Sequence, residues 1–386
     1  IKERSEKEHL QMDPDSNDDP FANSAAAGGD EFMAVKPYTG TIKHIRKKSR
    51  TGQLAFGTID TWLLWKLTSG SIHATDYTNA SRTMLFNITK KQWDDDLLEI
   101  FDIPKNILPN VFPSSNLFGY TNTKDFKVKI PITGLIGDQQ ASLFGQKCFN
   151  KNDIKCTYGT GSFLLINTGD QYINSNSGLL TTLACNKKGL PSYALEGSIF
   201  IGGAIIQWLR DELKIINNAN ETNDIALSIN DTNGVVIVPA FVGLGAPYWN
   251  SNAKGIIYGL TRGANRNHII RAALESIAFQ VNDLIKLIEK DINSQITNIS
   301  VDGGATQNKF LMQFQANISK INISKSLNIE TTAIGAAMLA GILVQFFDKE
   351  SNLKTNNSTV FSNKIKNKDR QDLLKNWDSA IKIINI

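Results

Sequence analysis

The chain has 386 residues, 41% of them hydrophobic, and its 41 basic and 37 acidic residues give a formal net charge of +4. This size and composition suit one large or two medium globular domains with substantial cores. No run of about 18 apolar residues occurs, so we expect no membrane span. The first residues, IKERSEKEHLQMD, lack the apolar region of a secretory signal.

Cysteine usage bears on the compartment. The three cysteines, Cys148, Cys156 and Cys185, have no metal-like spacing, and an odd number cannot all pair within one chain. No disulfide framework is implied, which favours a reducing, cytoplasmic environment. The charge balance by itself argues neither for nor against nucleic acid, and we expect no nucleic-acid partner.

The first fifty residues differ in character from the rest. Residues 1–30 are polar and acidic and can bury little apolar surface. The stretch 29-GDEFMAVKPYTGTIK-43 resembles the short motif of echinoderm microtubule-associated-protein-like proteins, but no propeller repeats follow it. The basic cluster 43-KHIRKKSR-50 suits a nuclear or phosphate-binding patch, although we favour a solvated linker. We treat residues 1–52 as an unrelated, largely disordered segment, either a fusion or a gene-assembly error, and infer no tubulin binding.

From residue 53 the sequence becomes that of a globular protein. The stretch 59-IDTWLLWKLTSG-70 predicts an amphipathic helix closed by Gly70. The stretch 93-WDDDLLEIFDI-103 predicts a second helix, whose acidic triplet 94–96 is typical of a helix start rather than a metal site. The apolar run 129-KIPITGLIGD-138 predicts a buried strand that leads into a turn.

One carboxylate follows that turn. Asp138 stands in 134-GLIGDQQASLFG-145, after a glycine and before two glutamines. Taken alone, the pattern favours a helix start, because the helix dipole and free N–H groups stabilise an acid there. The alternative is a functional carboxylate, for which the rest of the chain has to supply support.

After residue 150 strands and helices alternate. The pattern predicts a strand–turn–strand unit, a glycine-opened helix, a buried strand, a long amphipathic helix, a strand–turn–helix unit and a helix of small residues, at 154–169, 200–217, 234–245, 266–290, 298–318 and 330–344. His268, near the start of the long helix, is typical of a cap or packing residue. Such alternation predicts a layered α/β architecture.

Three short strands end in glycine-rich turns, at 157-TYGTGS-162, 200-FIGGAIIQ-207 and 301-VDGGATQN-308. None matches the Walker loop or the G-x-G-x-x-G fingerprint. Each alone is most simply a turn. Together they indicate a phosphate site, because glycine lets a phosphate approach backbone N–H groups that cradle the anion. Thr160 adds a hydroxyl donor within the first turn.

These turns, together with Asp138 in GLIGDQQ and ETTAIGAA at 330–337, resemble the FGGY family of carbohydrate kinases. Within that family, 76-DYTNASRTMLFNI-88 and 239-PAFVGLGAPYW-249 are similar to the glycerol-phosphorylating members. The resemblance covers about residues 53–380. It implies an actin/hexokinase-like α/β fold, in which two ribonuclease-H-like domains close over ATP and glycerol.

The resemblance also implies domain limits. Residues 53–146 would be the remainder of the N-terminal domain, residues 147–345 the C-terminal nucleotide-binding domain, and residues 346–386 a helical tail. Related kinases often form dimers or tetramers, so a homo-oligomer is compatible with this assignment.

Site residues follow from the same resemblance, position by position. Asp138 would take the proton of the attacking glycerol hydroxyl, Gln139 would hydrogen-bond glycerol, and Phe163 would wall its carbons. The implied ATP-binding residues are Thr160, Gly161, Gly203, Gln207, Gly304 and Asn308. ATP and Mg²⁺ are the implied cofactors, and no metal ligand is assigned in this chain.

The chain departs from the family pattern at one point. Full-length members begin with a D-x-G-T phosphate hairpin, followed by an Arg-Glu pair that grips glycerol, and the 386 residues contain neither. We therefore expect that most of the first half of the N-terminal domain is missing, and that the chain turns over weakly if at all. The alternatives are another FGGY sugar or polyol kinase, or a non-catalytic nucleotide-binding fragment.

Overall fold

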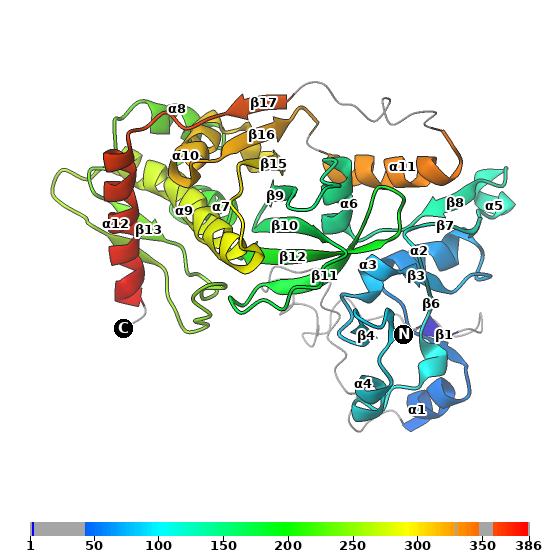
Figure 1. The fold of residues 1–386 in the computed structure, drawn as a ribbon. Coiled ribbons are helices and arrows are strands. Elements are labelled where there is room, and N and C mark those ends of the chain that lie inside the picture. Colours follow the sequence, from blue (N-terminus) through cyan, green and yellow to red (C-terminus); the bar gives the residue numbers. More distant parts are fainter. Residues whose placement is uncertain (1, 4–42, 329, 347–357, 385–386) are drawn as a thin grey trace.

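The computed structural model describes residues 2–3, 43–328, 330–346 and 358–384. Figure 1 shows two lobes, a larger one built mainly from residues after about 150 and a smaller one from residues before about 135. The segment 29–43 that resembles a microtubule-associated motif lies outside the described residues, Lys43 apart. Among the described residues, no helix is both long enough and apolar enough to cross a bilayer.

A seven-stranded mixed sheet forms the centre of the larger lobe. Its order is β11-β12-β10-β9-β15-β16-β17. Strands β9, β10, β12 and β11 pair antiparallel, whereas β15 runs parallel to both β9 and β16. The strands are β9 Ile154–Tyr158, β10 Ser162–Gly169, β11 Leu180–Cys185, β12 Pro191–Ile199, β15 Asn298–Asp302, β16 Asn322–Ser326 and β17 Ser358–Phe361.

The helices and the remaining strands of this lobe follow the predicted alternation. The long helix and the strand–turn–helix unit are confirmed as α9 and as β15 with α10. The elements are α6 Asp138–Gly145, α7 Ala204–Asp211, α8 Glu221–Leu227, β13 Val236–Val238, β14 Ile256–Tyr258, α9 Arg266–Ile292, η3 Gly304–Gln307, α10 Lys309–Ser319, α11 Thr331–Leu343 and α12 Asn367–Ile384.

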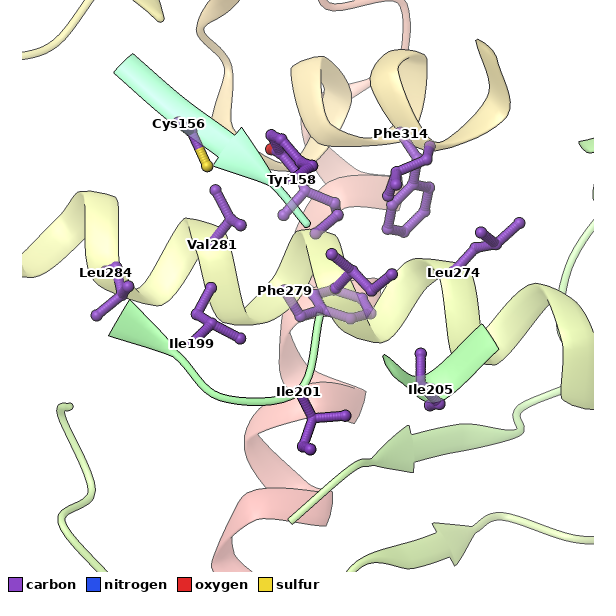
Figure 2. Close-up of a cluster of buried hydrophobic side chains, with 14 of the residues drawn as sticks. Cys156, Tyr158, Ile199, Ile201, Ile205, Leu274, Phe279, Val281, Leu284 and Phe314 are labelled. Atoms are coloured by element: carbon purple, nitrogen blue, oxygen red, sulfur yellow. The ribbon is translucent and has the colours of Figure 1, made fainter. Parts of the chain in front are cut away.

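One face of the sheet is apolar and packs on α9. Cys156 and Tyr158 of β9 and Ile199 of β12 meet Phe279 and Val281 of that helix, as Figure 2 shows. All five are buried. Because side chains alternate along a strand, this face takes every second residue of β9 and leaves Lys155 and Thr157 on the other face.

The described C-terminal elements pack onto this core. Strand β17 pairs antiparallel with β16 at the edge of the sheet. Trp377 of α12 is fully buried, and its ring stacks on Phe279 with centroids 5.1 Å apart. Its indole nitrogen also donates to Asp283 at 2.7 Å. Residues 358–384 are thus part of the larger lobe (Figure 1).

Helices α6 and α11 lie against each other beside the smaller lobe (Figure 1). Two glycines make their close approach possible. A Cβ at Gly335 would stand 1.9 Å from the carbonyl oxygen of Ala141, and one at Gly145 would stand 2.1 Å from that of Thr331. The helix of small residues predicted at 330–344 is confirmed, and its glycine at 335 allows the two backbones to pack closely.

The smaller lobe contains short helices and two-stranded sheets. Its apolar core includes the buried side chains of Phe56, Leu85, Phe86 and Trp93. Its elements are β1 Lys2–Glu3, α1 Lys43–Arg50, β2 Leu54–Ala55, α2 Ile59–Leu67, β3 Ala74–Asp76, α3 Tyr77–Ala80, β4 Phe86–Asn87, β5 Gln92–Trp93, α4 Asp95–Ile100, η2 Lys105–Ile107, β6 Asn110–Phe112, β7 Ser115–Tyr120, α5 Thr123–Phe126 and β8 Pro131–Gly134.

Two segments of this lobe differ from expectation. The basic cluster 43–50, for which we favoured a linker, forms helix α1, and Arg50 contacts Asp102 at 3.0 Å. Helix α2 is not amphipathic in the expected sense: it buries Leu64 but leaves Ile59 70% and Leu63 53% exposed. Periodicity over so short a helix did not show which side would be covered.

Candidate active site

Asp138 is the first residue of α6, and its side chain is exposed. The backbone just before it is fixed from the smaller lobe. The N–H of Gly137 donates to the Thr78 hydroxyl at 2.8 Å, and that hydroxyl donates in turn to the Asp76 carboxylate at 2.7 Å. The carboxylate of Asp138 therefore lies at the N-terminus of α6, and the residue before it, Gly137, is held in place through Thr78 by the buried carboxylate of Asp76.

The Asp76 carboxylate joins three segments of the smaller lobe. It is fully buried, and it accepts hydrogen bonds from the N–H groups of Thr78 and Asn79 and from the Ser114 hydroxyl at 2.6 Å. Burial raises the pKa of Asp76, and these hydrogen bonds oppose that rise. These donors meet the hydrogen-bonding needs of the buried carboxylate. Asp76 therefore serves as a rigid anchor for the turn that precedes Asp138.

A buried lysine on β9 contacts the residue that follows Asp138. The Lys155 ammonium donates to the side-chain oxygen of Gln139, and to the Thr157 hydroxyl at 2.9 Å. The lysine has no exposed surface. Desolvation lowers its pKa, and the charge of Asp302 is the largest opposing influence. The start of α6 is thus tied directly to the central sheet.

Strand register places Phe163 on the same face as this lysine. Phe163 of β10 stands opposite Thr157 of β9, and Thr157 also stands beside Asp302 of β15. Residues paired in this way point to one face of a sheet. The structure therefore brings Gln139, through Lys155 and Thr157, to the face that carries Phe163.

Polar contacts hold α6 and α11 to this face. The Ser142 hydroxyl donates to Asp302 at 2.9 Å and lies 3.1 Å from the Thr331 hydroxyl, which also donates to Asp302. One carboxylate oxygen of Asp302 is buried and has no hydrogen-bond partner among the described residues. Asp302 of the sheet is consequently hydrogen-bonded to both α6 and α11.

A buried ion pair joins the two lobes nearby. Arg82, which follows α3, forms two hydrogen bonds with Glu196 of β12, at 2.8 and 3.1 Å. Glu196 is 2% exposed, and it lies on the face of the sheet that carries Lys155. This pair fixes the end of α3 against the sheet.

The first two glycine turns are hydrogen-bonded to each other. The N–H groups of Gly202 and Ala204 donate to the carbonyl of Thr160, at 2.8 and 3.0 Å, and that of Gly203 donates to Gly159 at 2.8 Å. A Cβ at Gly203 would stand 2.8 Å from the Gly159 oxygen, so this approach requires glycine. The N–H groups of the second turn are thus engaged with the first turn.

The remaining predicted nucleotide residues lie in and near the turns. Thr160 and Gln207 are exposed, whereas Gly161, also in the first turn, is buried. Gly304 is exposed, with open space where a Cβ would stand. The Asn308 side chain caps α10 by accepting from Leu311, and its nitrogen donates to Thr222 at 3.0 Å. That amide thus also has a structural role.

Two sequence interpretations are confirmed. His268 caps α9, because its ring nitrogen accepts from the Asn265 N–H at 3.0 Å. Asp94 caps α4, with Asp95 and Asp96 in the first turn, so the acidic triplet is a helix start. In the described part of the chain, no three histidines, cysteines or acids converge in a way that would hold a metal ion.

Sequence reasoning missed the residues behind the site, namely Lys155, Asp302 and Asp76. A signal existed for the lysine, since a charge inside the otherwise apolar segment 154-IKCTY-158 marks either an exposed face or a buried polar contact. Nothing local separates those two cases. The neighbours of Lys155 come from α6 and β15, which are distant in sequence.

The chain is similar to known carbohydrate kinases along most of its length. The model of the FGGY family of carbohydrate kinases matches in its N-terminal domain at residues 39–145 and in its C-terminal domain at residues 154–344. The glycerol kinase of Clostridium botulinum (strain 657 / Type Ba4) is 52% identical over 349 residues, which cover 90% of this chain and 70% of that protein. The glycerol kinase of Haemophilus influenzae is 49% identical over 95% of this chain and 74% of its own length.

Solved structures agree with the sequence matches. The structure of Plasmodium falciparum glycerol kinase with ADP superposes with a TM-score of 0.83 at 40% identity, over 89% of this chain and 69% of that one. A xylulose kinase from Lactobacillus acidophilus superposes with a TM-score of 0.75 at 22% identity, over 89% of this chain and 70% of that one, which shows the shared fold alone. On these matches, the chain belongs to the FGGY family of carbohydrate kinases.

Proposed function

We propose that this chain carries the machinery to transfer the γ-phosphoryl group of ATP to glycerol, giving glycerol 3-phosphate and ADP. Two lines of similarity support the substrates. Glycerol kinases are about half identical to this chain over nine-tenths of its length. A structure of similar fold at 40% identity is a glycerol kinase with ADP.

The observation that carries the proposal is the placement of α6. Its second residue, Gln139, accepts a hydrogen bond from Lys155 of β9, and β9 leads within a few residues to the turn at Thr160. The helix that begins with the exposed carboxylate of Asp138 is thereby tied to the strand that leads into the candidate phosphate turn. Positioning and charge stabilisation dominate phosphoryl transfer, so such rigid placement is what the reaction requires.

Asp138 acts as the proton acceptor. It orients the attacking hydroxyl of glycerol and receives its proton as the new oxygen–phosphorus bond forms and the bond from γ-phosphorus to ADP breaks. Gln139 hydrogen-bonds a glycerol hydroxyl, and Phe163 covers the carbon chain from the same face of the sheet. The hydroxyl proton thus moves to the carboxylate, while the bonding electrons of the broken P–O bond leave with ADP.

The nucleotide lies along the turns. Because the N–H groups of Gly202, Gly203 and Ala204 are already engaged, the phosphates take their donors from the first turn, at Thr160 and Gly161. Gly203 then contributes by letting the two turns approach each other closely, and not by donating a hydrogen bond to the phosphates. Gln207, Gly304 and Asn308 lie on the side of the α-phosphate and adenosine, and the open space at Gly304 leaves room for a ligand.

Mg²⁺ fits this site as the counterion of the nucleotide. Magnesium is usually held by one or two carboxylates together with substrate phosphates, rather than by a cage of protein ligands. The described residues form no such cage, and Asp138 is an exposed carboxylate at the start of α6. When bound with ATP, the ion would neutralise phosphate charge.

The proposal is tested by measuring phosphoryl transfer from radiolabelled ATP. The chain is present in excess over ATP, so that even a slow transfer reaction is detected. Glycerol, xylulose and gluconate are offered in parallel. We expect glycerol 3-phosphate to form fastest, and Asp138→Asn to reduce its rate at least 100-fold. Asp153→Asn, a change at a partly exposed hydrogen-bonded acid outside the site, serves as the control.

Preference for xylulose or gluconate would reassign the substrate within the family. Calorimetric binding of ADP without transfer to any acceptor would favour a nucleotide-binding protein without catalysis. Transfer to glycerol that Asp138→Asn leaves unchanged would refute the assigned role of this carboxylate.

A further inference from the structure

We infer that Lys155 is a positioning residue for substrate, which fixes the Gln139 amide so that its nitrogen, and not its oxygen, faces the acceptor. The inference rests on the proposed function, because it assigns the group that meets a glycerol hydroxyl. No residue of the predicted site performs this task, and Lys155 itself was not among the predicted site residues.

The chemistry of the contact determines which end of the amide is occupied. A lysine ammonium carries three donors and no acceptor, so it can face only the oxygen of a glutamine side chain. In the structure the Lys155 ammonium donates to that oxygen. Rotation of the amide by 180° would bring its NH₂ group against the ammonium, which is repulsive. The NH₂ group of Gln139 is therefore left to donate toward the substrate side.

Acidic groups on the surrounding elements oppose the desolvation that lowers the pKa of Lys155. Asp302 on β15 exerts the strongest favourable charge, and Asp138 on α6 and Glu196 on β12 add to it. The Thr157 hydroxyl accepts a second hydrogen bond, at 2.9 Å. These neighbours come from α6 and from three strands, so the ammonium is surrounded by groups that stabilise it.

Packing alone does not explain a lysine at this position. Lys155 has no exposed surface and stands opposite Leu165 on β10. A methionine of similar length would fill the same space without the cost of desolvating a charge. What methionine cannot do is hold an amide in one orientation, and this difference defines the experiment.

Lys155→Met is compared with Lys151→Met, a matched control. Lys151 also donates to a glutamine, Gln171 at 2.8 Å, but that pair is exposed and lies outside the site. Both variants lose one Lys–Gln hydrogen bond. The first readout is the nuclear magnetic resonance signal of the Gln139 side-chain NH₂ pair, identified by its loss in Gln139→Glu. The second is the split between KM for glycerol, KM for ATP and kcat.

We expect Lys155→Met to shift the Gln139 NH₂ pair toward the positions of freely rotating amides, and Lys151→Met to leave it unchanged. We expect the KM for glycerol to rise about 3- to 10-fold, the equivalent of one hydrogen bond, while the KM for ATP stays constant. An unshifted NH₂ pair, or a loss shared equally by both substrates, would overturn the inference.

Two further points keep the test decisive. If Lys155→Met fails to fold, the double variant Lys155→Met/Asp302→Asn removes both charges and carries the same expectations. If the unmodified chain does not phosphorylate glycerol, the proposed function fails, and the NMR signal alone then decides whether Lys155 orients the amide.

Discussion

Replacement of Gly335 by alanine tests how tightly α6, the helix that begins at Asp138, is held. A Cβ at this position would stand 1.9 Å from the carbonyl oxygen of Ala141, whereas ordinary contact begins at 3.4 Å. The neighbouring atoms are backbone and cannot rotate away. Helices α6 and α11 would have to separate by about 1.5 Å, the difference between those two values.

The energetic effect can be worked from these contacts. Overpacking of this kind costs about 1–3 kcal/mol. Loss of the Thr331 hydrogen bonds to Ser142 and Asp302 would cost about 1–3 kcal/mol more, because Asp302 is buried. The better helix propensity of alanine returns about 1 kcal/mol. We expect a net destabilisation of about 1–5 kcal/mol.

Urea unfolding followed by tryptophan fluorescence measures this effect. Gly304→Ala is the control, because nothing lies within 4 Å of the added Cβ, and we expect its stability to change by no more than about 0.5 kcal/mol. Displacement of α6 should also lower phosphoryl transfer by about 100-fold for each ångström that Asp138 moves. A Gly335→Ala chain as stable as the unmodified one would refute the close-packing argument.

Three further outcomes are expected. Burial, and next the charge of Asp76, raise the pKa of Asp60 from 3.8 to about 6. Between these pH values the folded state binds a proton that the unfolded state has lost, so the stability of the fold falls as pH rises from about 4 to about 6. In Asp60→Asn the urea concentration at the unfolding midpoint should depend less on pH over that range. Arg82→Met leaves the buried charge of Glu196 without its partner, and we expect thermal unfolding to show a loss of stability of about 3–5 kcal/mol. Arg82→Met/Glu196→Gln removes both charges and should recover much of that stability. A double variant no more stable than the single one would contradict this. Because the 386 residues contain no D-x-G-T motif, glycerol 3-phosphate formation by them alone should remain well below about one turnover per second, the low end of ordinary enzymes, and a rate near that value would show the motif to be dispensable.

Patterns local to the sequence predicted much of the larger lobe. Glycine-rich turns at 157–162 and 301–308 and the long apolar period of 266–290 correspond to observed elements, because turn chemistry and helix periodicity are properties of neighbouring residues. The close packing of 330–344 on another helix was also predictable, since small residues on one helix permit it.

The arrangement behind the site was not predictable in this way. Lys155 meets Gln139 and approaches Asp302 only because β9 pairs with β15 across more than a hundred residues and α6 packs over them. Such pairing is fixed by the packing of the whole lobe, which local periodicity does not specify. For the same reason, the role of Trp377 in the core could not be derived from its own segment.

The burial of Trp377 has a consequence for how the protein is made. Its stacking partner, Phe279, leaves the ribosome 98 residues earlier, a delay of about 5–20 s at synthesis rates of roughly 5–20 residues per second. During that interval the apolar side of α9 lacks its final cover, and binding by a chaperone would protect it. Nascent chains stalled before residue 377 should therefore be captured by such factors, and released chains should not.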